Sequence, residues 1–263
     1  MLLRTKVEEH LDGWKADLPV AWQGVFRDIE INLAAIPESV EIHDNIQIFP
    51  RRRNLGINNA PTDSHICRAF DGIDPDRVRV IVLGQDPYPD VAAATGRAFE
   101  DGTEDIHRRA LRPALCALGQ SASELRPGAN RPAVCHDPEG RAAFIRRKFD
   151  RLTAIGVLFI NSAWTFTRKQ DKEYHMALWR PVASHLLQHL NDRQDRNLVF
   201  LLLGGDAQRT VDELRLSKAE GDRPVRNYHP TARNNLYFKN ANPLHRVNVK
   251  LRALGEPEIP WWE

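Results

Sequence analysis

The sequence predicts an α/β fold, a three-layer sandwich with a central four-stranded, parallel, twisted sheet. Short apolar runs rich in β-branched residues recur along the chain, stretches with helical apolar spacing separate them, and each run stops at glycine or at polar residues. Strands without a polar face need cover on both sides, so helices should pack on each face of the sheet. The 263 residues suffice for one such domain with a substantial core.

The N-terminal part is expected to be helical. Apolar residues recur every three or four positions around 20–35, which predicts an amphipathic helix carrying Trp22, Val25, Phe26, Ile29 and Leu33. The stretch 46–65 is rich in Pro, Asn and Gly, which predicts a long loop or a broken element. No internal repeat or low-complexity tract divides the chain, so we expect a single domain over 1–263 with a helical leader, 1–40, packed on it.

The strands and helices of the sandwich follow. Residues 78–83, 156–161 and 198–204 predict buried strands, and 225–229 predicts a weaker fourth strand. Helical spacing indicates one helix through 144–155 and another through 176–190. The stretch 101–140 has many Arg, Pro and Gly residues and predicts only loops and short helices.

Polar residues stand at the carboxyl ends of the predicted strands, where ligands bind in such sheets. Asp86 follows the first strand, Asn161 ends the second, and His229 ends the fourth. Each has an ordinary explanation alone: a turn or helix-capping Asp, an Asn that satisfies backbone groups, and a structural His. Their convergence on one rim is harder to explain by accident and predicts a site that uses an acid, an amide and an imidazole.

Composition excludes several classes of protein. Charged residues make up 27% of the chain and hydrophobic residues 42%, which excludes wholesale disorder. The chain shows no apolar run of the roughly 18 residues that span a membrane, and no secretory signal pattern. Three widely spaced cysteines argue against a disulfide framework or an iron–sulfur cluster and favour a reducing cytoplasm. The net charge is only +2, yet 29 of the 37 basic residues are Arg. This bias reflects either phosphate recognition by arginines or ordinary surface charge.

The segment Gly84-Gln85-Asp86-Pro87-Tyr88 resembles the water-activating motif of the family 1 uracil-DNA glycosylases, and the resemblance covers most of the chain. Further segments are similar to that family in order and spacing: Gly96-Arg97-Ala98-Phe99 with its uracil-stacking Phe, Leu158-Phe159-Ile160-Asn161 with its uracil-reading Asn, the phosphate-contacting loop 203–208, His229-Pro230-Thr231 at the start of its DNA-intercalating loop, and the closing segment 257–261.

The resemblance implies a monofunctional glycosylase that hydrolyses the N-glycosidic bond of uracil in single- or double-stranded DNA and initiates base excision repair. It implies a monomer in the cytoplasm, without metal, cofactor or membrane contact. Asp86 and His229 would be catalytic. The base-binding residues would be Gln85, Tyr88, Phe99 and Asn161, with the base flipped out of the helix. The DNA-binding residues would be Arg233, Thr231, Pro230, Gly205, Pro50 and Arg51.

The chain departs from the family at four positions. Pro89 stands where the motif continues with His, Gly205 replaces a Ser, and Ala110 falls where a phosphate-contacting Ser is expected. Arg233 occupies the position of the intercalating Leu, four residues after the catalytic His. We expect its guanidinium to replace that wedge, with Leu236 or Tyr237 as the alternatives. The phage-encoded inhibitor that mimics DNA buries the family's Leu, so an Arg there predicts weak or no inhibition.

Several basic clusters have two explanations. Arg51, Arg52 and Arg53 would either contact phosphate or form a solvated turn. The arginines at 108, 109 and 112 could take over the lost hydroxyl contacts, whereas those at 141, 146, 147 and 151 are expected on the solvated side of a helix. Two other functions remain open: a related glycosylase with specificity for other damaged or mismatched bases, and a uracil-DNA binding protein without turnover. A nucleotide-binding enzyme is disfavoured because no G-x-G-x-x-G or Walker-type loop is present.

Overall fold

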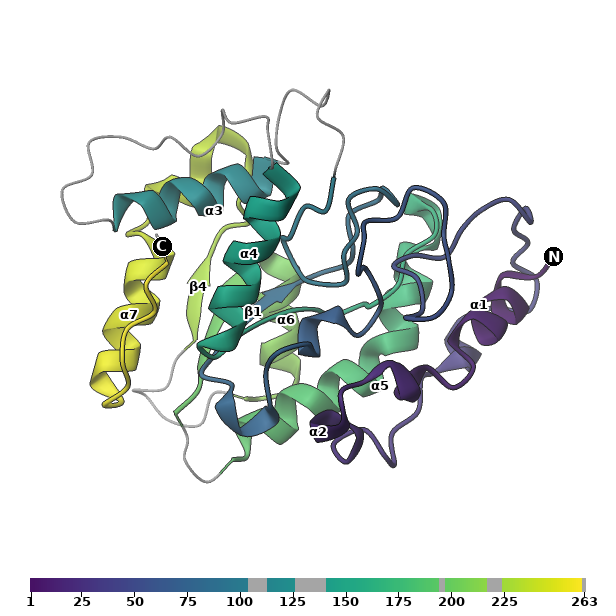
Figure 1. Cartoon of the computed structure of the whole chain (residues 1–263), viewed down its shortest axis with the longest axis horizontal. Coiled ribbons are helices and arrows are strands. Elements are labelled where there is room, and N and C mark those ends of the chain that lie inside the picture. The colour runs from purple at the N-terminus through teal and green to yellow at the C-terminus, as the bar shows by residue number, and fades with distance from the viewer. Residues whose placement is uncertain (104–112, 126–140, 194–196, 217–223, 262–263) are drawn as a thin grey trace.

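The computed structural model describes residues 1–103, 113–125, 141–193, 197–216 and 224–261. Its centre is a sheet of four strands in the order β2-β1-β3-β4, every pair of which is parallel (Figure 1). The strands are β1 (Val80–Gly84), β2 (Val157–Asn161), β3 (Val199–Leu203) and β4 (Val225–Asn227). The predicted parallel α/β sheet is therefore confirmed, and all three long strands are buried along their whole length.

Helices cover both faces of the sheet, as expected for strands that lack a polar side. Alternate residues of β1 point to opposite faces, so Ile81 and Leu83 belong to one apolar cluster and Val80 and Val82 to the other. The first cluster includes residues of α1 (Leu3–Leu11), α5 (Lys172–Asn191) and α6 (Gly205–Glu213). The second includes residues of α3 (Pro113–Glu124), α4 (Arg141–Ala154) and α7 (Pro243–Ala253).

The predicted helix over 20–35 is wrong. The chain forms only the four-residue α2 (Val20–Gln23), then turns and a 3-10 segment at Leu33–Ala35. The apolar spacing is real, because Trp22 and Phe26 are fully buried, but polar groups here bond to distant parts of the fold. The Trp22 indole donates to the carbonyl of Ile73, and the backbone N–H of Asn32 donates to the carbonyl of Leu178. Tertiary packing therefore overrides the helical pattern.

The two helices predicted downstream are confirmed as α4 and α5. The stretch 101–140 contains more regular structure than expected, because α3 is a helix of 12 residues. The rest of that stretch, 104–112 and 126–140, lies outside the described residues, and with it Arg108, Arg109, Ala110, Arg112 and Cys135.

The N-terminal segment packs on the sheet through both apolar and charged contacts. Leu3, Val7 and Leu11 share one apolar cluster with strand residues. The Asp17 carboxylate accepts hydrogen bonds from the Arg52 side chain at 2.7 Å and from the Arg53 backbone amide at 2.9 Å. Arg52 is thus not a solvated turn residue, because its side chain is buried in an ion pair with Asp17.

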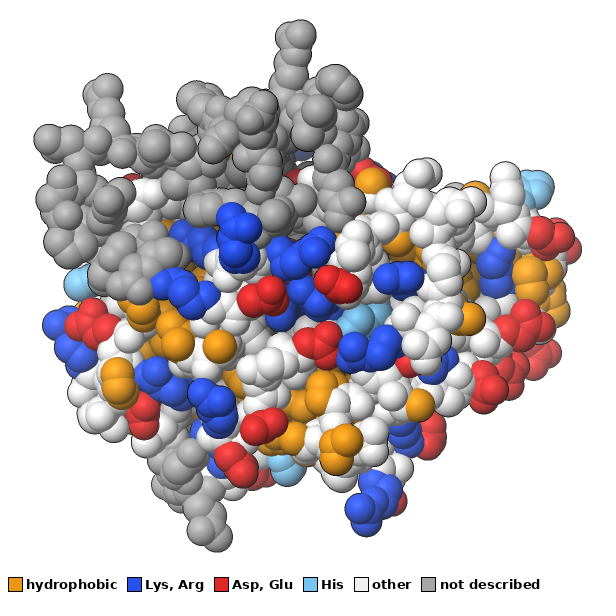
Figure 2. Space-filling view, viewed as in Figure 1, with side chains coloured by type: hydrophobic (Ala, Val, Ile, Leu, Met, Phe, Trp, Pro, Cys, Tyr) orange, Lys and Arg blue, Asp and Glu red, His pale blue; other side chains and the backbone are white. Residues whose placement is uncertain are grey.

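The described surface carries mixed charge. Acidic side chains gather at the α1 end of the face in Figure 2, while Lys and Arg side chains near its centre are interspersed with acidic ones. No helix within the described residues combines the length and apolar character that a membrane crossing needs.

Candidate active site

A cavity of about 350 Å³ opens at the carboxyl ends of β1, β2 and β4. The loop after β1, the segment 94–99, the end of β2 and the segment after β4 line it, so residues far apart in the sequence meet there. The predicted site residues that line it are Gln85, Asp86, Tyr88, Phe99, Asn161, His229 and Thr231. The structure therefore places an acid, an amide and an imidazole around one hollow.

Asp86 is a largely desolvated carboxyl group at the cavity. Its side chain is 19% exposed, and Oδ1 lies 3.9 Å from Nζ of Lys172, the first residue of α5. Burial raises the pKa of Asp86, and the Lys172 ammonium opposes that shift. A neighbouring cation thus favours the charged form of a carboxylate that burial alone would tend to neutralise.

Asn161 lines the cavity, and Gly84 makes room for it. The two residues are register partners on β1 and β2, and Asn161 is 5% exposed. A Cβ atom on Gly84 would overlap the Asn161 amide oxygen and lie 2.9 Å from Cβ of Ala98. The backbone carbonyl of Asn161 accepts from the Trp164 indole at 3.0 Å, which fixes the chain at the end of β2. The space left by the missing side chain at Gly84 therefore holds the carboxamide at the cavity.

His229 has a hydrogen-bond arrangement that defines its tautomer. Nδ1 accepts from the Thr231 backbone amide at 3.2 Å and lies 2.7 Å from the Thr231 hydroxyl. An acceptor at Nδ1 leaves the ring proton on Nε2. Burial of the ring lowers the pKa of His229, and the positive charge of Lys172 lowers it further. The geometry and the electrostatics both favour a neutral imidazole that donates from Nε2.

Phe99 and Tyr88 form the aromatic wall of the cavity. The Tyr88 hydroxyl donates to the Phe99 carbonyl at 3.3 Å, and the Phe99 and His229 ring centroids are 6.0 Å apart. Phe99 has φ of 66°, a left-handed conformation that is uncommon for a bulky residue. Such backbone conformations persist where the surroundings hold them, and they cluster at ligand sites.

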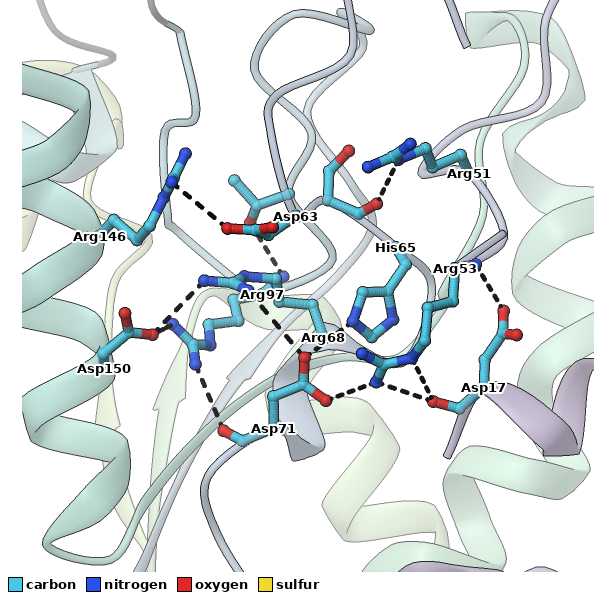
Figure 3. Close-up of polar contacts among 12 residues, drawn as sticks. Asp17, Arg51, Arg53, Asp63, His65, Arg68, Asp71, Arg97, Arg146 and Asp150 are labelled. Carbon is cyan, nitrogen blue, oxygen red and sulfur yellow. Dashed lines mark hydrogen bonds and ion pairs between the residues drawn. The ribbon is translucent and has the colours of Figure 1, made fainter. Parts of the chain in front are cut away.

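Behind the cavity lies a charged network that the sequence analysis did not identify (Figure 3). Arg97 lines the cavity, yet its side chain is only 2% exposed, and it donates to the Asp150 carboxylate of α4 at 2.6 Å. Arg68 reaches the same carboxylate at 3.4 Å. His65 contacts Asp71 at 2.8 Å, and Arg53 joins Asp71 to the N-terminal segment. This network ties the cavity wall to α4 and to the leader.

Lys172 is the second residue that sequence reasoning missed. Its position at the start of a helix can be inferred from the sequence, but nothing there distinguishes it from the nearby exposed Lys169. For Arg97 the signal is equally weak, because a buried arginine and a surface arginine look alike without their partners.

The remaining predicted DNA contacts lie outside the cavity lining. Arg233 is exposed at the start of the 3-10 segment Arg233–Lys239. Gly205 is exposed at the start of α6, Pro230 is buried beside His229, and Pro50 is buried. Arg51 is half-buried, and its Nε donates to the Ser64 carbonyl at 2.8 Å.

The structure also decides several smaller expectations. Tyr237 is buried and hydrogen-bonds to the Ser121 hydroxyl at 3.1 Å, so it is not available as a wedge, whereas Leu236 is half-buried.

Arg146 and Arg151 are not fully solvated, since they donate to carbonyls of Thr62 and Pro260. Trp261 is buried as a tail anchor, Cys67 is buried and Cys116 is half-buried. Within the described residues, no cluster of three or more His, Cys, Asp or Glu side chains could hold a metal ion.

Comparison with known proteins places this geometry in a family. The model of the Uracil DNA glycosylase superfamily matches residues 70–252. The uracil-DNA glycosylase of Varicella-zoster virus is 26% identical over 213 residues, which cover 81% of this chain and 63% of the viral protein. That of human cytomegalovirus strain Merlin is 30% identical over 180 residues, covering 67% of this chain and 64% of the relative. The chain therefore spans less than two thirds of the length of these two relatives.

A bacterial relative and two solved structures extend the comparison. The Bacillus pumilus uracil-DNA glycosylase is 26% identical over 204 residues, covering 76% of this chain and 80% of the relative. The UNG structure from Nitratifractor salsuginis has a TM-score of 0.62 at 22% identity, covering 95% of this chain and 97% of that one. Mimivirus uracil-DNA glycosylase has a TM-score of 0.65 at 18% identity, covering 94% and 88% of the two chains. These structures share the fold, and the match of the family over most of the chain shows that this protein belongs to the uracil DNA glycosylase superfamily.

Proposed function

We propose that this protein is a monofunctional DNA glycosylase that hydrolyses the bond between uracil and deoxyribose, leaves an abasic site and initiates base excision repair. The observation that carries the proposal is the joint placement of Asp86, Asn161 and His229 around one cavity in a member of this superfamily. The substrate is uracil in single- or double-stranded DNA. The protein acts as a monomer in the cytoplasm without a metal or cofactor.

The size and position of the cavity support base flipping. Its volume of about 350 Å³ lies near the lower end of the range for small-molecule sites, roughly 300–1,000 Å³. A duplex cannot enter such a hollow, whereas a single nucleotide can. The target base must therefore leave the helix to reach Asn161, which is buried in the cavity lining.

Asp86 is proposed to support the sugar side of the reaction. Cleavage of the N-glycosidic bond leaves positive charge on the sugar, and a carboxylate nearby stabilises that charge and orients the attacking water. In this protein Pro89 stands beside the motif and offers no side-chain donor for that water. The ionised Asp86 carboxylate therefore carries the water-orienting role in our proposal.

His229 is proposed to support the departing base. Negative charge develops on uracil as the bond breaks, and a donor at O2 stabilises it. The neutral ring of His229 can donate from Nε2 because Nδ1 is occupied by Thr231. A neutral donor does not depend on protonation of the ring, and the lowered pKa of His229 keeps this form populated at physiological pH.

Asn161, Phe99 and Tyr88 are proposed to select the base. The Asn161 carboxamide can accept from uracil N3–H and donate to O4, a pairing that cytosine cannot match. Phe99 would stack on the flipped base, and Tyr88 would stand where the methyl group of thymine would go. Gln85 contributes through its backbone, since its carbonyl accepts from the Ala163 amide at 2.9 Å and so fixes the cavity wall.

The DNA backbone is proposed to lie across the rim that carries Arg233, Thr231 and Gly205. Arg233 and Thr231 are exposed on the segment that follows His229, and Gly205 is exposed at the start of α6. Arg51 would add a phosphate contact through the part of its guanidinium that does not bond to Ser64. Pro50 and Pro230 are buried and would shape these loops without a direct contact by their rings.

A consequence concerns the DNA-mimicking inhibitor of the family. A variant of the mimivirus enzyme has been solved in complex with UGI, at 18% identity to this chain and a TM-score of 0.62. An inhibitor pocket shaped for an apolar side chain would have to bury the charge of Arg233 without a partner, which costs several kcal/mol. We propose weak or no inhibition of this protein, and stoichiometric inhibition at nanomolar concentration would contradict that.

The proposed activity is tested with a labelled oligonucleotide that carries one uracil, followed by alkali to cleave abasic sites. The wild-type protein should produce a single cleaved product, and Asp86→Asn and His229→Ala should reduce kcat by at least about 100-fold. A wild-type protein that binds the uracil oligonucleotide without releasing base would instead support a binding function. Cleavage at thymine or cytosine mismatches in preference to uracil would support a shifted specificity.

A further inference from the structure

Lys172 is a cation beside the candidate site that takes no part in the catalytic steps proposed above. Its Nζ lies 3.9 Å from Oδ1 of Asp86, and its side chain is 28% exposed. The same positive charge also acts on His229, which comes from a different element of the fold. The ammonium group thus lies beside Asp86, and Asp86 and His229 line the same cavity.

The backbone around Lys172 is firmly held. The preceding Asp171 is buried, and its carboxylate accepts from the Thr167 hydroxyl at 2.8 Å and from Arg168 at 2.7 Å. One turn further, the buried His175 ring bonds to the hydroxyls of Thr165 and Thr167 at 2.9 and 3.0 Å. These contacts fix the start of α5 against the segment that follows β2. The ammonium group is therefore presented from a rigid element, as electrostatic preorganisation requires.

We propose that Lys172 is a positioning residue that holds Asp86 in its charged form and His229 in its neutral form, so that one cation prepares both groups for catalysis. The catalytic consequence rests on the proposed function. The electrostatic coupling does not, because it can be measured in the protein without DNA.

The direction of the effect follows from the charges that surround the two groups. Burial and the nearby Glu173 raise the pKa of Asp86, and Lys172 alone opposes them among the described residues. Burial lowers the pKa of His229, and Lys172 acts in the same direction. Removing the ammonium group should therefore raise both values: Asp86 would become harder to ionise and His229 easier to protonate. Both changes reduce the fraction of protein with a charged Asp86 and a neutral His229 at acidic pH.

The first test is an NMR titration of the Asp86 carboxyl carbon and the His229 ring in the free protein. In Lys172→Met both pKa values should rise by about half a pH unit to one unit, a range reduced from that of buried pairs because Lys172 is partly exposed. Lys172→Arg should keep both values near those of the wild type because it keeps the charge. Lys169→Met is the matched control, since it removes an exposed lysine from the same segment. Values in Lys172→Met that match the control would overturn the proposal.

The second test is the pH dependence of uracil release under saturating DNA. The apparent pKa of the acidic limb of the kcat–pH profile should rise by the same half to one pH unit in Lys172→Met. In Lys172→Arg it should return to the wild-type value. Lys172→Gln repeats the measurement with a polar, uncharged side chain, and thermal unfolding verifies that each variant is folded. A higher KM with an unchanged pH profile would make Lys172 a DNA-phosphate contact and contradict the proposal. If the wild type releases no uracil, the proposed function fails, while the NMR titration still decides the coupling.

Discussion

Gly84 and Asn161 lie opposite each other on β1 and β2, and the Asn161 amide occupies the space that a side chain on Gly84 would need. Gly84→Ala should therefore displace the carboxamide from the cavity, because Ala98 closes the other side at 2.9 Å from the added methyl group. Loss of a uracil-reading hydrogen-bond pair should reduce kcat/KM by about 100-fold or more. Single-turnover kinetics on a uracil oligonucleotide measure this.

Gly24→Ala is the control for that substitution. Gly24 has ordinary helical angles and open space around the added methyl group, so kcat/KM should remain at the wild-type value. If Gly84→Ala retains full activity and uracil specificity, Asn161 does not read the base from the position described above.

His175 makes stability depend on pH. Its ring is buried between two threonine hydroxyls, and burial lowers its pKa to about 4. The unfolded chain binds this proton near the ordinary value of 6.5, so stability is full above that pH and is lost as the pH falls toward 4. The loss attributable to His175 should approach about 3 kcal/mol at pH 4, because its pKa is 6.5 in the unfolded chain and about 4 in the folded protein. Urea unfolding at a series of pH values measures it.

His175→Gln should lower stability at pH 7.5, because it disturbs the threonine contacts, yet it should flatten the decline toward acid. His43→Gln is the matched control, since His43 is exposed. His10, whose pKa burial lowers to about 4, should keep part of the slope in both variants. An acid decline of equal steepness in His175→Gln and His43→Gln would show that His175 does not contribute.

The sheet and the convergence of the site could be predicted from the sequence because both depend on local pattern. Apolar runs define buried strands, and the carboxyl ends of parallel strands meet at one edge, so Asp86, Asn161 and His229 had to lie near one another once the strands were placed. The helix over 20–35 could not be predicted correctly. Apolar spacing reports only which side chains face the core, and Trp22 reaches it from the four-residue α2 while Phe26 reaches it from the turn that follows.

The charged part of the site could not be predicted for a different reason. Arg52 looks like a solvated or DNA-binding arginine in the sequence, and its burial depends on Asp17, which lies 35 residues earlier. Arg97 likewise depends on Asp150, which lies 53 residues later. A charged residue is recognisable as internal only when its partner is known, and single-sequence patterns do not pair residues over such distances.

Arg233 should matter most when the target base must leave a duplex. Its exposed guanidinium follows His229 by four residues and can stack on bases or contact phosphate. Arg233→Ala should reduce kcat/KM on double-stranded uracil DNA by about tenfold, with a smaller loss on single-stranded DNA, where no stacked partner must be displaced. Arg27→Ala removes an exposed charge from the leader and corrects for loss of general attraction to DNA. Equal losses on both substrates, or a greater loss in Leu236→Ala, would argue against Arg233 as the wedge.

The N-terminal leader should unfold together with the rest of the chain, because the buried pair Asp17–Arg52 and the packing of Trp14 on the core both join the two. Asp17→Asn leaves the Arg52 guanidinium, 11% exposed, without its charged partner and should cost on the order of 3 kcal/mol of unfolding free energy. The loss should appear as one cooperative transition by both circular dichroism and tryptophan fluorescence, since Trp14 of the leader packs on Trp164 and Trp179 of the core at 5.6 and 5.3 Å. Asp28→Asn, which changes an exposed carboxylate of the leader, should leave stability within about 0.5 kcal/mol of the wild type. Two separate transitions in Asp17→Asn would show that the packing of Trp14 does not by itself couple the leader to the sandwich.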